Sequence, residues 1–183
     1  MVPNIIVFHT NTKDKIEKFV SNKEMIYYED KHYLGNGMYF WDNEGNAKYW
    51  ANKKLSENKG VINEVYISKA NLLLDETILD LTNVEIIKLV RTLWIEYCDK
   101  LEEKNKNQFI GTILDILRKY FPILNDMKVS KCHGDYSHYN KNSFLSKLGN
   151  KSFIDDRPRT IYAVTCETKI TNPELFEVIS IVV

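Results

Sequence analysis

The segment that decides the fold is Gly35-Asn36-Gly37-Met38-Tyr39-Phe40-Trp41-Asp42, followed closely by Asn46-Ala47-Lys48-Tyr49-Trp50-Ala51. Two glycines two positions apart favour a tight turn, because glycine has no Cβ. The three aromatic residues that follow are costly to leave in water. Ala47, Trp50 and Ala51 recur at helical spacing behind a predicted N-cap at Asn43. The pattern predicts a flat slot for a planar ring, or alternatively a glycine-bracketed strand whose aromatics belong to the core.

This segment resembles the nicotinamide-binding segment of the ADP-ribosyltransferases of the diphtheria-toxin and poly(ADP-ribose)-polymerase class. The resemblance is carried by Gly-x-Gly-x-Tyr-Phe, by the small residue Ala47 and by the aromatic Trp50. Enzymes of that class use a His–Tyr–Glu triad, with His on the first strand, Tyr in this segment and Glu on a late strand. The resemblance therefore implies that His9, Tyr39 and Glu167 are the catalytic residues.

The first predicted strand ends at His9 and Thr10. Residues 5–8 are β-branched, apolar or aromatic, which is typical of a buried strand, and Asn11 or Thr12 can cap the helix that follows. In the family, the His contacts an adenosine-ribose hydroxyl and the backbone of the next residue holds the nicotinamide amide. The family usually has His-Gly where this chain has Thr10. A purely structural His at a strand end is the alternative.

The last predicted unit is a hairpin that carries Glu167. Residues 160–170 are rich in β-branched residues, Asn172 and Pro173 favour a turn, and residues 176–183 form a final apolar run. In the family, the catalytic Glu lies on the first strand of such a closing hairpin. The alternative is a solvated strand carboxylate.

The resemblance implies an α+β fold with an ADP-ribosyltransferase-like split β-sheet core. A chain of 183 residues fits one domain over 1–183. Helical spacing after a capping box at Thr82–Glu85, and again over Phe109–Tyr120, predicts two antiparallel helices. We expect this αα-hairpin to be a helical insertion on the core, at about 83–122.

Composition limits the location and the partners. Lys and Arg together number 25, as do Asp and Glu, so the net charge of zero argues against a general electrostatic grip on nucleic acid. Three widely spaced cysteines do not form a disulfide framework, which predicts reduced thiols and a cytoplasmic protein. The sequence predicts neither a signal peptide nor a membrane span.

A short run of possible metal ligands lies in the second half of the chain, at Cys132, His133, Asp135 and His138. No second ligand pair follows at a spacing typical of zinc sites, so we expect no metal. His133-Gly134 imitates the family's His-Gly, but it comes after the Tyr segment and follows no apolar run.

The resemblance implies NAD as a substrate whose nicotinamide–ribose bond is broken, with transfer of ADP-ribose to a macromolecular acceptor. Glu167 would stabilise the oxocarbenium-like transition state, because a carboxylate suits charge that develops on the ribose. Tyr39 would stack on nicotinamide, and Trp50 would cover its other side or support Tyr39. The residues expected to bind NAD are His9, Thr10, Gly37, Tyr39, Ala47 and Trp50.

The acceptor and the biological role are less defined. Arg157 and Arg159 precede the predicted catalytic strand and are candidate acceptor contacts, for a protein or for single-stranded nucleic acid. The alternatives are an NAD glycohydrolase, which uses water as acceptor, and an inactive NAD-fold binding module, which the departure at Thr10 favours. By family analogy alone, the chain could be a toxin of a toxin–antitoxin or phage-defence system, with an antitoxin or immunity protein as partner.

Overall fold

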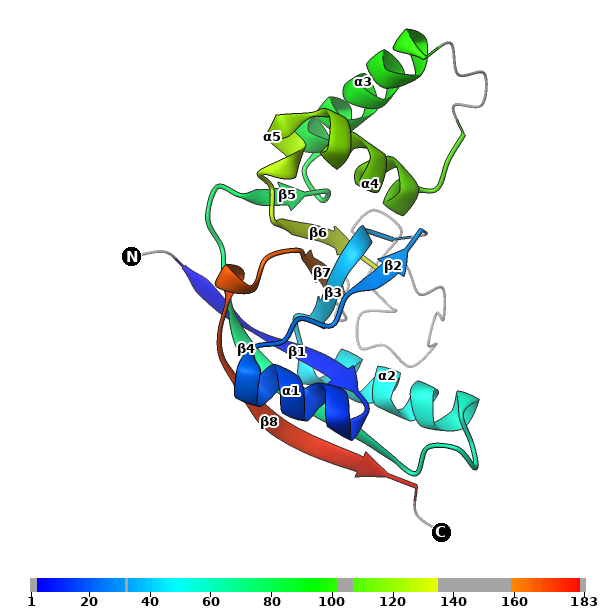
Figure 1. The fold of residues 1–183 in the computed structure, drawn as a ribbon, viewed down its shortest axis with the longest axis vertical. Coiled ribbons are helices and arrows are strands. Elements are labelled where there is room, and N and C mark those ends of the chain that lie inside the picture. The colour runs from blue at the N-terminus through cyan, green and yellow to red at the C-terminus, as the bar shows by residue number, and fades with distance from the viewer. Residues whose placement is uncertain (1–2, 32, 102–106, 135–158, 182–183) are drawn as a thin grey trace, which may run out of the picture.

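The computed structural model describes residues 3–31, 33–101, 107–134 and 159–181, which form a mixed sheet with helices on both faces (Figure 1). The strands are β1 (Asn4–Asn11), β2 (Tyr28–Asp30), β3 (Gly35–Trp41), β4 (Glu64–Leu73), β5 (Ile78–Asp80), β6 (Val129–His133), β7 (Thr160–Val164) and β8 (Ile170–Ser180). The helices are α1 (Lys13–Asn22), α2 (Glu44–Glu57), α3 (Val84–Lys100), α4 (Ile110–Tyr120) and α5 (Pro122–Asn125), with a 3₁₀ turn at Glu167–Lys169. None of these helices is long and apolar enough to cross a membrane.

The sheet has a narrow join in its middle. The strand order is β5-β6-β7-β3-β1-β4-β8, with β2 added on β3, and of the neighbouring strands in the described part of the chain only β5 and β6 run parallel. β1 pairs with β4 along its whole length, from Asn4 to Asn11. By contrast, β1 pairs with β3 at a single register position, Phe8 opposite Trp41. The predicted α+β class is confirmed, whereas the ADP-ribosyltransferase-like form of the sheet stays a prediction.

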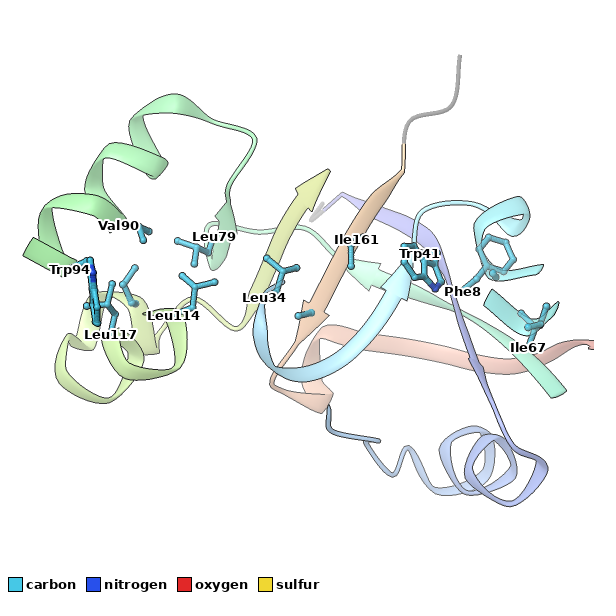
Figure 2. Packing of buried hydrophobic residues seen from close by; sticks show 14 of the residues in the cluster. Phe8, Leu34, Trp41, Ile67, Leu79, Val90, Trp94, Leu114, Leu117 and Ile161 are labelled. Carbon is cyan, nitrogen blue, oxygen red and sulfur yellow. The ribbon is translucent and has the colours of Figure 1, made fainter. Parts of the chain in front are cut away.

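Side chains alternate between two apolar layers, as the two-residue period of a strand requires. Val7, Met38 and Phe40 lie on the face that α1 covers, where they pack with Phe19. Phe8, Trp41, Leu34 and residues of α2, α3 and α4 form the larger layer on the opposite face. Figure 2 shows that layer running from Trp94 and Leu117, past Leu34, to Phe8 and Ile67.

The two predicted helices of the 83–122 region are present as α3 and α4. The N-cap of α3 is Asn83, whose side chain accepts from the backbone N–H of Glu85 at 2.9 Å, while Thr82 bonds the Asp80 carboxylate instead. The apolar faces of α3 and α4 bury Val90 and Leu114 among other residues, and α4 packs against β3.

The predicted closing hairpin is wrong. β7 pairs with β3 and β6, whereas β8 pairs with β4 at the other end of the sheet. The chain must therefore cross from one half of the sheet to the other, and a two-stranded hairpin cannot do that. Glu167 lies in the 3₁₀ turn of this crossing and not on a strand.

The predicted turn at Asn172 and Pro173 is also wrong, because β8 runs through both residues. Asn172 has a φ of 50°, and the register between β4 and β8 is irregular opposite Lys69–Asn71. Asn is one of the few residues that tolerate this left-handed conformation. The local sequence therefore marks an irregularity within a strand and not its end.

Both the backbone conformation and the tertiary packing require glycine at position 35. Its φ is +77°, and a Cβ there would lie 2.4 Å from the Asp115 Oδ1 and 2.8 Å from the Gly111 carbonyl oxygen of α4. The close approach lets the Asp115 carboxylate accept from the backbone N–H of Asn36 at 2.8 Å. Asp115 also pairs with the buried Arg118, which donates to the Leu34 carbonyl at 3.3 Å. The start of β3 is thereby fixed to α4.

Replacement of Gly35 by alanine should destabilise the protein by roughly 2 kcal/mol or more, since left-handed strain alone costs about 1–2 kcal/mol and crowding against α4 adds to it. Gly60→Ala is the matched control, because Gly60 has a φ of +84° but nothing within 4 Å of its Cβ position. Urea unfolding measures both variants. Equal losses in the two would contradict the role of crowding at Gly35.

Candidate functional site

His9 is enclosed within the sheet. The residue is only 3% exposed, and its ring lies 5.6 Å from the Phe40 ring and 6.4 Å from the Phe19 ring. The Nδ1 atom is 2.7 Å from the carbonyl oxygen of Tyr39, and Nε2 is 3.3 Å from the amide nitrogen of Asn11. A carbonyl can only accept and an amide N–H donates. His9 is therefore the neutral tautomer with its proton on Nδ1.

The protonation of His9 follows from this burial. Desolvation lowers the pKa of His9 from 6.5 to about 4, against the opposing effect of the Tyr39 carbonyl. The charges of Lys54 and Lys15 lower this pKa further. His9 is therefore neutral throughout the physiological range.

Asn11 is the hub of the polar groups around His9, and sequence analysis assigned it only a possible capping role. It is 1% exposed. Its Oδ1 accepts from the backbone N–H of Thr12 and from the Lys54 ammonium, both at 2.9 Å. Its amide group donates to His9 and, at 2.5 Å, to the hydroxyl of Tyr28. Its position two residues after His9, on the same face of a strand, is the signal that could have revealed it.

Thr10 and Tyr39 point to the opposite face of the sheet, where Ala47 and Trp50 of α2 also lie. The Thr10 hydroxyl donates to the Ala47 carbonyl at 3.1 Å. The Tyr39 hydroxyl donates to the Gly35 carbonyl at 2.6 Å and accepts from the Leu34 N–H at 3.2 Å. Neighbouring strands thus bring His9 and Tyr39 together, but their side chains point to opposite faces, and the contact uses the Tyr39 backbone.

At the place where the sequence predicts an aromatic slot, Trp50 of α2 packs against Trp41 of β3. Their rings stack with centroids 5.4 Å apart and an interplanar angle of 16°. The Lys53 ammonium lies 4.4 Å from the centroid of the Trp50 ring. Gly37 allows β3 and β7 to approach closely, because a Cβ there would lie 3.2 Å from that of Ala163.

Glu167 is exposed on the crossing from β7 to β8, beside Tyr27. Burial, and then the charge of Glu167, raise the pKa of Tyr27. The Tyr27 hydroxyl donates to the Thr165 carbonyl at 3.4 Å, which attaches this connection to the segment before β2. Glu167 therefore lies on a connection between strands and not on a strand next to His9 or Tyr39.

The remaining predicted site residues lie near the β6–β7 end. Arg159 directly precedes β7, and its carbonyl accepts from the Gly134 N–H at 2.8 Å, whereas Arg157 lies outside the described residues. His133 is the last residue of strand β6, whose sequence Val-Ser-Lys-Cys-His is mixed polar and apolar. Asp135 and His138 are not described, and the residues that the structure does describe include no group of three able to hold a metal.

A cavity that the sequence did not reveal lies between α3, α4 and the sheet. Its volume is about 540 Å³, within the usual range for small-molecule sites. It is lined by Tyr33, Leu34, Leu81, Ile87, Val90, Arg91, Trp94, Ile110, Ile113, Cys132 and His133. It contains neither His9 nor Glu167 and is separate from the predicted site.

A protein of Methanocaldococcus jannaschii, described as uncharacterised, is 29% identical to this chain over 139 residues. The match covers 64% of this chain and 64% of that protein, so the chain spans just under two thirds of that relative's length. No family model matches the chain, and neither does any solved structure. The function is therefore inferred from the geometry of the site.

The burial of His9 predicts a pH dependence of stability. Because the folded pKa is lowered to about 4, the unfolded chain binds a proton between pH 6.5 and 4 while the folded protein does not. The free energy of unfolding should therefore be highest above pH 6.5, and it should fall by about 3 kcal/mol as the pH decreases to 4. Urea unfolding at several pH values measures this slope. In His9→Gln that part of the slope should vanish, and an unchanged slope would contradict the account.

Proposed function

We propose that the protein is an NAD-dependent mono-ADP-ribosyltransferase. The observation that carries the proposal is that the His9-Thr10 pair at the end of β1 is hydrogen-bonded to the segment that resembles the nicotinamide-binding segment. His9 donates to the carbonyl of Tyr39, 30 residues away, and Thr10 donates to the carbonyl of Ala47, 37 residues away. These four residues are the ones that the resemblance assigns to a single NAD site.

In this proposal nicotinamide lies on the α2 face, near Thr10, Tyr39 and Trp50. One face of the Trp50 ring is stacked on Trp41, and the Lys53 ammonium lies over that ring. A ligand ring that stacks on Trp50 would displace Lys53, whose ion pair with Glu57 is long, at 3.8 Å, and solvent-exposed. Such an ion pair contributes little to stability, so its displacement costs little.

Glu167 is the carboxylate proposed to stabilise the ribose cation. It lies on the connection that follows β7, and β7 is the strand that pairs with β3 next to Tyr39. Arg159, before the same strand, remains the proposed acceptor contact among the described residues. A macromolecular acceptor, a cytoplasmic location and an antitoxin partner are further parts of this proposal.

A second candidate function is NAD binding without transfer. It is favoured by His9, because both of its ring nitrogens already form hydrogen bonds, to Tyr39 and to Asn11. It is also favoured by the position of Glu167 in a 3₁₀ turn. In that case His9 serves the fold, and the α2 face alone contacts the ligand.

The experiment that separates these functions is incubation of the full chain with NAD carrying a label on adenosine, in the presence of cell lysate. Free nicotinamide is quantified, and the macromolecular fraction is digested with protease or nuclease to find the label. Transfer predicts nicotinamide release together with macromolecular label. NAD binding without nicotinamide release would support the second candidate, and the absence of NAD binding would contradict both.

Glu167→Gln should lower the rate of nicotinamide release by about 10²–10³, the usual effect of removing one group that stabilises transition-state charge, while NAD affinity is retained. Glu174→Gln is the matched control, because Glu174 is an exposed carboxylate on β8 whose ion pair with Lys69 of β4 has an N–O distance of 3.0 Å. Wild-type turnover in Glu167→Gln would exclude Glu167 from catalysis.

A further inference from the structure

Two lysines near the end of β1 have no carboxylate partner among the described residues, although one of them is half-buried. Lys54 of α2 reaches Asn11 at 2.9 Å, and Lys15 of α1 lies 5.4 Å from the centroid of the Tyr28 ring. By contrast, many other lysines of the described chain form ion pairs, namely Lys13, Lys48, Lys53, Lys69, Lys88, Lys100, Lys131 and Lys169. A half-buried ammonium without a counter-ion is costly, so this arrangement needs an explanation.

The groups around the two lysines offer several hydrogen-bond donors. Asn11 uses all four of its hydrogen-bonding positions within the protein. The hydroxyl of Tyr28 accepts from Asn11, which leaves its own proton free to donate. Lys54 donates one proton to Asn11, which leaves two, and Lys15 is exposed with three.

The electrostatics agree with this geometry. Burial, and then the nearby charge of Lys15, lower the pKa of Lys54. The same two lysines lower the pKa of His9. Both lysine charges therefore act on one small region, at the end of β1 between α1 and α2 (Figure 1). An anion bound there would relieve the mutual repulsion of the lysines.

We propose that Lys15, Lys54 and the Tyr28 hydroxyl form a binding site for a phosphate or diphosphate group. Phosphate offers several strong acceptor oxygens and carries the charge that the two ammonium groups lack. Lys54 is one helical turn after Trp50, so the anion site shares helix α2 with the proposed nicotinamide site. The anion site does not require that NAD is cleaved, and it can exist in a protein without transferase activity.

The test is titration of the full chain with inorganic pyrophosphate, ADP and adenosine, followed by calorimetry. Pyrophosphate and ADP should bind and adenosine should bind far more weakly. Lys54→Met and Lys15→Met should each weaken pyrophosphate binding about tenfold, the usual effect of losing one charged hydrogen bond, and Lys54→Arg should retain most of it. Lys13→Met is the control, because it removes an equal charge from α1 at a lysine paired with Glu17.

Thermal unfolding of the same variants separates binding from folding. Lys54→Met removes a half-buried charge and leaves Asn11 Oδ1 bonded to Thr12, so it should be at least as stable as the wild type while it binds pyrophosphate less well. Failure of folded wild-type protein to bind pyrophosphate would overturn the proposal. An equal loss in Lys13→Met would overturn it as well, since the attraction would then be diffuse and not a site.

Discussion

The hydrogen bond from His9 to the carbonyl of Tyr39 links β1 and β3 where the pairing within the sheet is shortest. β1 and β3 share one register pair, and among the described strands this pair connects the two halves of the sheet. Where the backbone ladder is so short, a buried side chain supplies a further link at 2.7 Å. In a dry environment such a bond is strong, and loss of either partner leaves an unsatisfied polar group.

This bond constrains what His9 can do. Its second nitrogen is occupied by Asn11, and Asn11 is in turn held by Thr12 and Lys54. The ring therefore has one tautomer, no charge and no free nitrogen. A ligand can be recognised at this place by the outer members of the network, Lys54 and the Tyr28 hydroxyl, without any contact to His9. In this network His9 stabilises the fold, whereas Lys54 and the Tyr28 hydroxyl are the groups that a ligand would contact.

Sequence patterns predicted the elements whose reasons are local. The β1 run, α2 with its cap at Asn43, and the helices α3 and α4 all follow from periodicity and capping, and the structure confirms them. The crossing at Glu167 was missed because strand pairing is decided by the whole sheet, and residues 160–183 alone cannot indicate it. The order of His9, Tyr39 and Glu167 along the chain likewise could not predict that the side chains of His9 and Tyr39 lie on opposite faces of the sheet. Gly35 illustrates the same limit, since its constraint comes from Asp115, 80 positions further along the chain.

The central claim is that His9 is a neutral, Nδ1-protonated link between β1 and β3 in the folded protein. It is tested most directly by ¹⁵N–¹H correlation spectra of the histidine side chains, recorded from pH 7 to pH 4. The account predicts that His9 shows one protonated and one unprotonated nitrogen at pH 7, with Nδ1 carrying the proton, and that this pattern persists to about pH 4. A His9 ring that takes up a second proton near pH 6.5, or that carries its single proton on Nε2, would contradict it.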